Sequence, residues 1–325
     1  MSDSQNRLKL IILSGFLGSG KSTWLRHQLY AESYYKPHII VNEVASQAVD
    51  DTLLHSAKAL DVLQGGCVCC DLKSQMVELL HGICNKRTRK LSEDSGGILI
   101  FEMSGVADPS NVMFAINDDP ILARHIVLEK IIVVVDGLHG IEQIKSEPLA
   151  RSQIEAADKI LISKAENCSE QDLSRLVATL KYMNPNENIT QSLFGVESCL
   201  PELKPAAPIM FSKREAADNL LPITSIHLNL DDLSLIADTW VGFSVWLSAL
   251  LNLHGDQIVR IKGIVRTPNG RLLLQSVRKV MQNPERIPDE LDNTLDIAEN
   301  KVVLIGRNLD EIEISGSLKK VLNDI

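Results

Sequence analysis

Short apolar runs alternate with amphipathic stretches over the first part of the chain. Leu8–Leu13 is apolar apart from Lys9, and runs rich in β-branched residues recur further along. Such runs are typical of strands buried on both faces, while the stretches between them have helical periodicity. Strands are predicted at Leu8–Leu13, His38–Val41, Ile98–Phe101, Ile131–Val135 and Lys159–Ile162, and helices at Thr23–Ser33, Ser74–Arg89 and Gln171–Met183. This alternation predicts an α/β fold with a doubly wound, mostly parallel sheet.

The pattern changes where prolines gather. Pro201, Pro205, Pro208 and Pro222 interrupt any helix or central strand, so residues 201–222 are predicted to be a linker. The linker separates a first domain, residues 1–200, from a smaller α+β domain, residues 223–325. The elements predicted in the second domain are Ser225–Leu230, a helix at Gly242–Leu253, strands Ile258–Arg266 and Arg271–Val277 joined by a turn, the strand Lys301–Ile305, and the partly helical Leu309–Leu322.

Composition and charge restrict the partners. The 325 residues are 45% hydrophobic, which is enough for more than one core, and the net charge is −9. An acidic surface does not suit nucleic acid or an anionic membrane, so neither partner is expected. Met1 to Asn6 is polar and has no signal-peptide pattern, and no apolar run approaches the roughly 20 residues that span a bilayer. A cytoplasmic protein is expected.

A glycine-rich segment follows the first apolar run. It reads Gly15-Phe16-Leu17-Gly18-Ser19-Gly20-Lys21-Ser22 and matches G-x-x-x-x-G-K-[ST] in full. Glycines let the backbone curl so that its N–H groups point inward, and the following helix N-terminus adds a positive dipole. Lys21 is expected to reach the β- and γ-phosphates of a nucleotide, and the Ser22 hydroxyl to bind Mg²⁺. The sequence therefore predicts a phosphate-binding loop (P-loop).

Acidic residues end two later apolar runs. Glu102 follows Ile98–Phe101, where a P-loop protein needs a carboxylate near its metal ion, and Gly105 lies where a backbone amide can sense the γ-phosphate. Asp136 ends Ile131–Val135, and a functional role is weighed there against an ordinary cap or turn residue.

A candidate base-recognition element follows the run Lys159–Ile162. It reads Ser163-Lys164-Ala165-Glu166, and its position and lysine fit the [N/T/S]-K-x-D element whose carboxylate pairs with guanine. Glu166 is one methylene longer than the usual aspartate. GTP is therefore an inference from position, not from a complete match.

Three of the six cysteines form a cluster. Cys67, Cys69 and Cys70 follow two glycines, and thiolates are preferred ligands of Zn²⁺ and other soft or borderline ions. Two of the three are expected to bind an ion together with donors from elsewhere. Reduced cysteines packed in a loop, and a redox dithiol, are the alternative interpretations. Small buried apolar side chains are expected at Cys84, Cys168 and Cys199.

In this order the motifs resemble the CobW family of P-loop GTPases, metal-trafficking relatives of the GTPases that insert nickel into urease and hydrogenase. The resemblance covers nearly the whole chain, and its G-x-C-x-C-C and E-x-S-G-x-A-D-P elements are highly specific. It rests on Gly15–Ser22, Asn42-Glu43, Gly65–Cys70, Glu102–Pro109, Asp136 and Ser163-Lys164. The C-terminal part is similar to the CobW C-terminal domain at Arg260–Gly263 and Val303–Gly306.

The resemblance implies a slow GTPase that delivers Zn²⁺ or Co²⁺ to a client metalloprotein or to an enzyme of metal-cofactor biosynthesis. GTP or GDP and Mg²⁺ are the implied cofactors, and a homodimer is one form considered. Nucleotide and magnesium binding is assigned to Gly15, Gly18, Ser19, Gly20, Lys21, Ser22, Thr23, Glu102 and Gly105, and catalysis to Lys21, Ser22 and Glu102. Guanine recognition is assigned to Ser163, Lys164 and Glu166, and the transition-metal site to Cys67, Cys69, Cys70 and Glu43.

The chain also departs from the family pattern. Asn42-Glu43 is commonly followed by Phe-Gly-Glu, whereas Val44-Ala45-Ser46 follow here, so an acidic candidate ligand is missing at Ser46. Two other functions are compatible with these motifs: a non-enzymatic metal buffer or sensor with a vestigial nucleotide fold, and a P-loop kinase of a small molecule. Intact Lys21 and Ser22 argue against the first. No basic substrate lid is recognisable for the second.

Overall fold

The structure is a computed structural model. It describes residues 7–43, 57–64, 72–89, 97–185, 188–209, 223–231, 237–255, 257–267, 270–287 and 299–323. The chain divides into two compact units between Glu215 and Ala216. Most of the expected linker lies outside the described residues, so the boundaries 1–200, 201–222 and 223–325 stay predictions.

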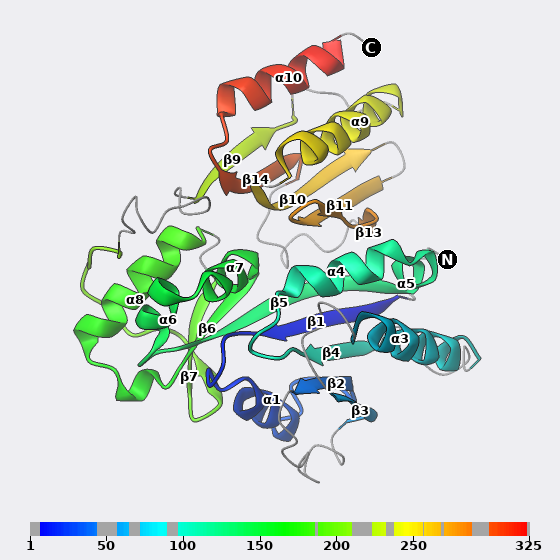
Figure 1. The fold of residues 1–325 in the computed structure, drawn as a ribbon. Helices are drawn as coiled ribbons and strands as arrows, with labels where there is room; N and C mark the ends of the chain where they lie inside the picture. The colour runs from blue at the N-terminus through cyan, green and yellow to red at the C-terminus, as the bar shows by residue number, and fades with distance from the viewer. Residues whose placement is uncertain are drawn as a thin grey trace. The chain divides into compact units, whose positions relative to one another are not determined.

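The first unit is built on an eight-stranded sheet with the order β3-β2-β4-β1-β5-β6-β7-β8 (Figure 1). All neighbouring strands are parallel except β7 and β8, which form an antiparallel hairpin at one edge. The strands are β1 Leu8–Ser14, β2 His38–Glu43, β3 Ala59–Gln64, β4 Ile98–Glu102, β5 Ile126–Asp136, β6 Lys159–Ser163, β7 Ile189–Leu193 and β8 Val196–Ser198.

Helices cover both faces of this sheet. α1 packs on one face, where Trp24, Leu25 and Leu29 join a buried cluster with residues of the central strands, and Figure 1 shows α4 on the opposite face. The helices are α1 Lys21–Tyr30, α3 Leu72–Arg89, α4 Pro109–Asp118, α5 Pro120–His125, α6 Gly140–Ser146, α7 Pro148–Ala156 and α8 Glu170–Met183, with a short 3₁₀ helix, η2, at Ala165–Asn167. The predicted doubly wound, mostly parallel α/β sheet is confirmed.

The second unit contains an antiparallel sheet with the order β12-β11-β10-β14-β9, and β13 also pairs with β11. Its strands are β9 Ile223–Asn229, β10 Ile258–Thr267, β11 Gly270–Val277, β12 Val280–Met281, β13 Glu285–Ile287 and β14 Lys301–Arg307. Two helices, α9 Ala237–His254 and α10 Glu311–Asn323, share one buried core with this sheet. The predicted smaller α+β domain is confirmed. Among all the described helices, none is both long and apolar enough to cross a membrane.

Candidate functional site

The glycine-rich loop connects β1 to α1, as its motif predicts. Gly15, Gly18 and Gly20 have φ values of 135°, 74° and 89°, in the region that side chains rarely adopt. A Cβ at Gly15 would lie 2.2 Å from the Val134 carbonyl oxygen on the neighbouring strand β5. Gly15 is therefore required both for its positive φ and because a side chain would clash with Val134.

Lys21 folds back over the loop. Its Nζ donates to the carbonyl oxygens of Gly15 at 2.8 Å and Phe16 at 3.3 Å, and the residue is buried. The Ser19 Oγ is also buried, and no hydrogen-bond partner for it lies among the described residues. A buried cation next to an unsatisfied hydroxyl, at the N-terminus of α1, fits an anionic phosphate group.

Ser22 and Glu102 meet although 80 residues separate them, because β4 pairs with β1 and brings Glu102 beside Leu13. The Ser22 Oγ donates to Glu102 Oε1 at 2.5 Å, and Glu102 is only 5% exposed. A hydroxyl and a carboxylate are hard oxygen donors of the kind that Mg²⁺ prefers. The donor pair therefore fits a magnesium ion at the start of α1.

The segment after β4 rests against the P-loop. A Cβ at Gly105 would lie 2.7 Å from the backbone nitrogen and 2.8 Å from the Cα of Leu17. Gln153, on α7 and 1% exposed, donates from Nε2 to the carbonyl oxygens of Ala107 at 2.8 Å and Gly105 at 3.4 Å. Gln153 was not predicted from the sequence. The only feature that could have indicated it is a polar amide among the apolar residues of α7, and that helix was itself not predicted.

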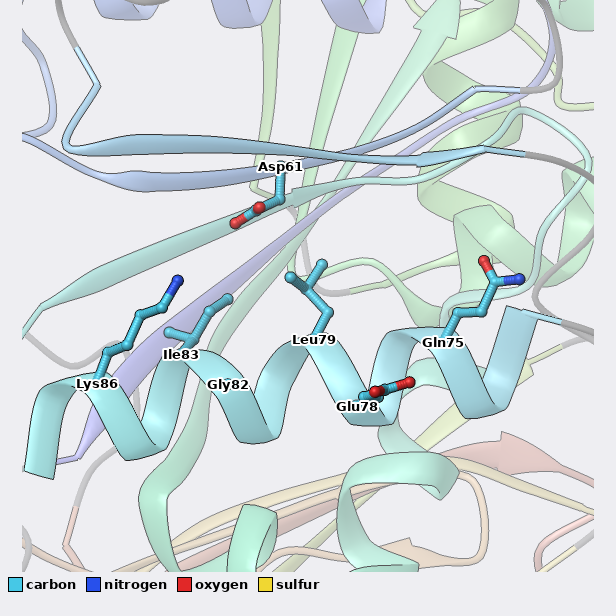
Figure 2. Close-up of a pocket in the computed structure, with 7 residues that line it drawn as sticks. All are labelled: Asp61, Gln75, Glu78, Leu79, Gly82, Ile83 and Lys86. Atoms are coloured by element: carbon cyan, nitrogen blue, oxygen red, sulfur yellow. The ribbon is translucent and has the colours of Figure 1, made fainter.

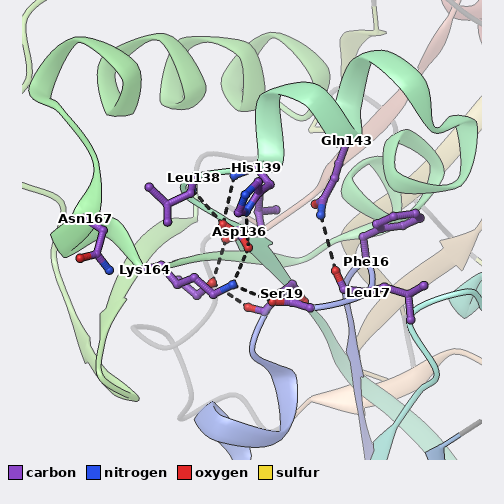
Figure 3. A network of polar contacts seen from close by, with 12 residues as sticks. Phe16, Leu17, Ser19, Asp136, Leu138, His139, Gln143, Lys164 and Asn167 are labelled. Atoms are coloured by element: carbon purple, nitrogen blue, oxygen red, sulfur yellow. Dashed lines mark hydrogen bonds and ion pairs between the residues drawn. The ribbon is translucent and has the colours of Figure 1, made fainter. Parts of the chain in front are cut away.

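Lys164 links β6 to the other side of the P-loop (Figure 3). Its Nζ donates to the Gly18 carbonyl oxygen at 2.9 Å and to Asp136 Oδ2 at 2.6 Å. The neighbouring Ser163 Oγ donates to the Ser19 carbonyl oxygen at 2.6 Å. Ser163 and Lys164 are thus both bonded to the backbone of the P-loop.

Asp136 is the centre of this network. Its Oδ1 accepts from the backbone N–H groups of Leu138 at 2.8 Å and His139 at 3.1 Å, and the residue is 2% exposed. Burial on its own would raise the pKa of Asp136, but the hydrogen bonds from Lys164, His139 and Leu138 outweigh it and lower that pKa. Asp136 is therefore a structural anion that fixes both the turn after β5 and the side chain of Lys164.

Two other predicted nucleotide residues lie at the surface. Glu166 is exposed on η2, where its Oε1 accepts from Asn167 Nδ2 at 3.4 Å. Thr23 is exposed on the first turn of α1. Neither makes a hydrogen bond to the P-loop in the described part of the chain, so their expected roles stay predictions.

The clustered cysteines Cys67, Cys69 and Cys70 lie outside the described residues, and Glu43 is the last residue of β2. Within the described ranges, no group of three or more His, Cys, Asp or Glu side chains is arranged to hold a metal ion. The described cysteines are Cys84, Cys168 and Cys199. Cys84 is buried, and burial raises the pKa of its thiol to about 11. The prediction of a buried side chain is wrong for Cys199, which is exposed after the edge strand β8, and Cys168 is half-buried.

Asn42 is the second buried polar residue that sequence reasoning did not assign. It is 2% exposed near the end of β2, and among the described residues neither its Oδ1 nor its Nδ2 has a hydrogen-bond partner. The preceding residue, Val41, lies beside Glu102 in the sheet. A buried amide without partners is costly. Asn42 is therefore a candidate to bond a polar group that the described residues do not supply.

A hollow of about 330 Å³ lies between β3 and α3. Figure 2 shows Gln75, Leu79, Ile83 and Lys86 extending from one side of α3 towards the strand that carries Asp61. None of the predicted site residues lines it. The hollow is therefore separate from the candidate nucleotide site.

The loop between β1 and α1, its buried lysine and its serine–carboxylate pair together define the class of P-loop nucleotide-binding proteins. The model of the CobW/HypB/UreG nucleotide-binding domain matches residues 9–191, and that of the cobalamin synthesis protein cobW C-terminal domain matches residues 239–322. The chain belongs to the CobW/HypB/UreG family.

Named relatives cover most of the chain. The zinc chaperone YjiA of Escherichia coli (strain K12) is 26% identical over 85% of this chain and 87% of its own length. The zinc-regulated GTPase metalloprotein activator 1 of Schizosaccharomyces pombe is 24% identical over 93% of this chain and 82% of its own. The crystal structure of Zn(II)-bound YjiA GTPase superposes with a TM-score of 0.57 at 22% identity, over 97% of this chain and 99% of that one, which shows the shared fold.

Proposed function

We propose that this protein is a metal-responsive GTPase that hydrolyses GTP to GDP and phosphate and delivers a transition metal, Zn²⁺ or Co²⁺, to a client metalloprotein in the cytoplasm. The observation that carries the proposal is the complete P-loop, with Lys21 folded over it and Ser22 bonded to Glu102. The names of the relatives, zinc chaperone and zinc-regulated GTPase, support the metal and the nucleotide.

Hydrolysis depends on position and charge in this mechanism. Phosphoryl transfer needs little covalent chemistry from the protein, so stabilising the charge on the phosphates is the main task. Lys21 exchanges its bonds to the Gly15 and Phe16 carbonyls for phosphate oxygens, and the Ser19 hydroxyl donates to the same group. Ser22 and Glu102 would hold Mg²⁺, whose positive charge would help to neutralise the phosphates. Slow basal turnover is expected, since no catalytic glutamine or arginine finger was recognised in the sequence.

Guanine recognition is proposed at the end of β6. Glu166 accepts hydrogen bonds from guanine N1–H and the exocyclic amine, while Lys164 and Ser163 keep the P-loop in place through their bonds to Gly18 and Ser19. The exposed position of Glu166 leaves its carboxylate accessible to a base. The extra methylene of Glu166 makes discrimination against adenine weaker than an aspartate gives.

The transition metal is cargo in this proposal. Cys67, Cys69 and Cys70 supply thiolates, of which two bind the ion, and Glu43 supplies an oxygen donor. Glu43 lies one residue after the unsatisfied Asn42, and Val41 before it pairs with Glu102. Glu43, the proposed metal ligand, is thus two residues from Val41, which lies beside the proposed magnesium ligand Glu102. We infer that the γ-phosphate and the transition metal shift the same conformational switch.

Turnover of GTP and ATP with Mg²⁺ tests the enzymatic part. GTP hydrolysis faster than ATP hydrolysis is expected for the wild type, with loss of activity in Lys21→Ala. Lys145→Ala is the matched control, because Lys145 is an exposed lysine that pairs only locally with Glu142. No turnover under any metal would favour the metal buffer or sensor, and ATP-dependent phosphorylation of a small molecule would favour the kinase.

A further inference from the structure

α9 carries exposed apolar side chains on its outward side in addition to the buried ones that face the sheet. Its inward side chains belong to the buried core, whereas Val241, Val245 and Leu253 are 61%, 62% and 77% exposed, and Ala249 between them is exposed. These four residues recur at every fourth position and form one ridge along the helix. Ser248 and Asn252 are also exposed, so the outward side of α9 combines this apolar ridge with uncharged polar side chains.

No charge interrupts this ridge. From Thr239 to Leu253 the helix contains neither an acidic nor a basic residue, although the chain as a whole carries a net charge of −9. Like charges repel two copies of an acidic protein over most of their surfaces. The α9 ridge is a surface at which two copies can meet without that repulsion.

α10 extends the same surface. Trp246 Nε1 on α9 donates to Ser317 Oγ on α10 at 2.9 Å, so the two helices lie side by side on the sheet. Ile312 is 86% exposed, and Glu313 beside it is exposed near the start of α10. Exposed basic residues, Lys319 and Lys320, lie near its other end. The exposed side of α10 is therefore acidic at one end and basic at the other.

Gly316 lies between these two ends. It is exposed in the middle of α10, and in the described structure no atom lies within 4 Å of the position that a Cβ would take. Glycine weakens the interior of a helix relative to alanine, and nothing around Gly316 within the described residues requires it. Close approach of a helix from outside gives a reason for the missing side chain.

We propose that the outward faces of α9 and α10 form a two-fold symmetric homodimer interface, in which each helix packs antiparallel on its counterpart. The uncharged ridges of α9 meet at the centre. The antiparallel arrangement brings Glu313 of one copy to Lys319 and Lys320 of the other, and symmetry repeats this contact. The surface is thus complementary to itself in charge.

The expected size predicts a weak dimer. At 1.5 Å per residue the ridge is about 18 Å long, and two adjacent helices are about 20 Å wide, so the patch covers roughly 400 Å² per copy. The area buried by both copies is then about 800 Å², below the roughly 1,000 Å² that marks a stable specific interface, so only a weak, transient dimer is expected. A dissociation constant in the micromolar range is expected.

Sedimentation velocity of the full chain, with a chelator and a reducing agent present, tests the proposal. We expect the weight-average sedimentation coefficient to rise with protein concentration. Val245→Glu places carboxylates at the interface centre and is expected to weaken dimerisation about tenfold or more. Val196→Glu is the control, since Val196 is 50% exposed on β8 in the other unit and should leave the dimer unchanged. Thermal unfolding of each variant confirms that it is folded.

Charge reversal tests the arrangement. Glu313→Lys and the pair Lys319→Glu/Lys320→Glu are each expected to weaken the dimer, and all three changes together to restore it. A monomer at every concentration, as expected if α9 is covered by the same chain or serves another partner, overturns the proposal. A dimer that survives Val245→Glu, or that is not restored by the combined reversal, overturns it as well.

Discussion

Lys164→Met tests how much the bond between β6 and the P-loop contributes to the structure. Methionine has a similar length and no hydrogen-bond donor, so it removes the bonds to Gly18 and Asp136 with little change in packing. The carboxylate of Asp136 keeps its bonds from Leu138 and His139, but loses the lysine cation at 2.6 Å.

The expected loss of unfolding free energy in Lys164→Met is moderate. A hydrogen bond to a charged group contributes about 1.5–3 kcal/mol when it is well shielded from water. The Lys164 side chain is 37% exposed. Solvent screening reduces the contribution of such a group, so we expect Lys164→Met to lower the free energy of unfolding by about 1–2 kcal/mol.

The variant also changes the response to acid. In the wild type the pKa of Asp136 is below its usual value of 3.8, because the hydrogen bonds outweigh the effect of burial. A depressed folded-state pKa stabilises the protein above the unfolded-state pKa, and this contribution is lost as pH falls through the folded-state pKa. Lys164→Met removes one of the lowering effects. The pKa of Asp136 then rises, and acid unfolding begins at a higher pH than in the wild type.

Urea unfolding of the wild type, Lys164→Met, Asp136→Asn and the double variant measures the coupling directly. Lys145→Met is the control, because Lys145 is an exposed lysine whose ion pair with Glu142 is local. We expect the two changes to be non-additive by about 1 kcal/mol at neutral pH, and the difference to shrink in acid. Purely additive effects at neutral pH would refute the link between Lys164 and Asp136.

Three further changes test two positions of the site and one helix cap outside it. Gly105→Ala places a Cβ within 2.8 Å of Leu17 backbone atoms, an overpacking that costs about 1–3 kcal/mol. The affinity for GDP, measured by calorimetry, should fall about tenfold, and an unchanged affinity would contradict the contact. Asn42→Leu should stabilise the nucleotide-free protein by about 1–3 kcal/mol in thermal unfolding while lowering GTP turnover, and a loss of stability would show that the amide has a partner. Asp119→Ala removes the cap of α5 and its bond to His81, which should cost about 0.5–2 kcal/mol at neutral pH. Since the Leu122 N–H and His81 lower the pKa of Asp119, this loss should fade as pH falls through the folded-state pKa, and a loss that persists in acid would contradict the assignment.

The sequence predicted the elements whose hydrophobic pattern is unambiguous. β1, β2, β4, β6 and the second half of β5 are mostly buried apolar runs, and a strand was predicted at each; the first half of β5, which contains Glu129 and Lys130, was missed. β3 was missed because it is an edge strand in which Asp61 and Gln64 interrupt the apolar pattern. α4 to α7 were missed because helices of ten residues or fewer carry little periodicity, although three of them begin with a proline after the cap.

The site likewise contains features that the sequence predicts and features that it does not. The geometry of the P-loop and the approach of Glu102 to Ser22 follow from a local motif and from strand order, and both were predictable. The bonds from Gln153 to Gly105 and from Lys164 to Gly18 join residues far apart in the sequence, at distances that no local pattern encodes. Asp136 could not be assigned from sequence, since a catalytic carboxylate and a turn residue look alike at the end of a strand.

The most direct test of the account is whether metal and nucleotide are coupled. GTP turnover should be measured with Mg²⁺, with and without one equivalent of Zn²⁺ or Co²⁺, for the wild type and for a variant with Cys67, Cys69 and Cys70 replaced by alanine. The transition metal is expected to change GTP turnover in the wild type alone. Turnover that is the same with and without the metal in both proteins would contradict it, and would leave a P-loop nucleotide hydrolase whose cysteine cluster serves another purpose.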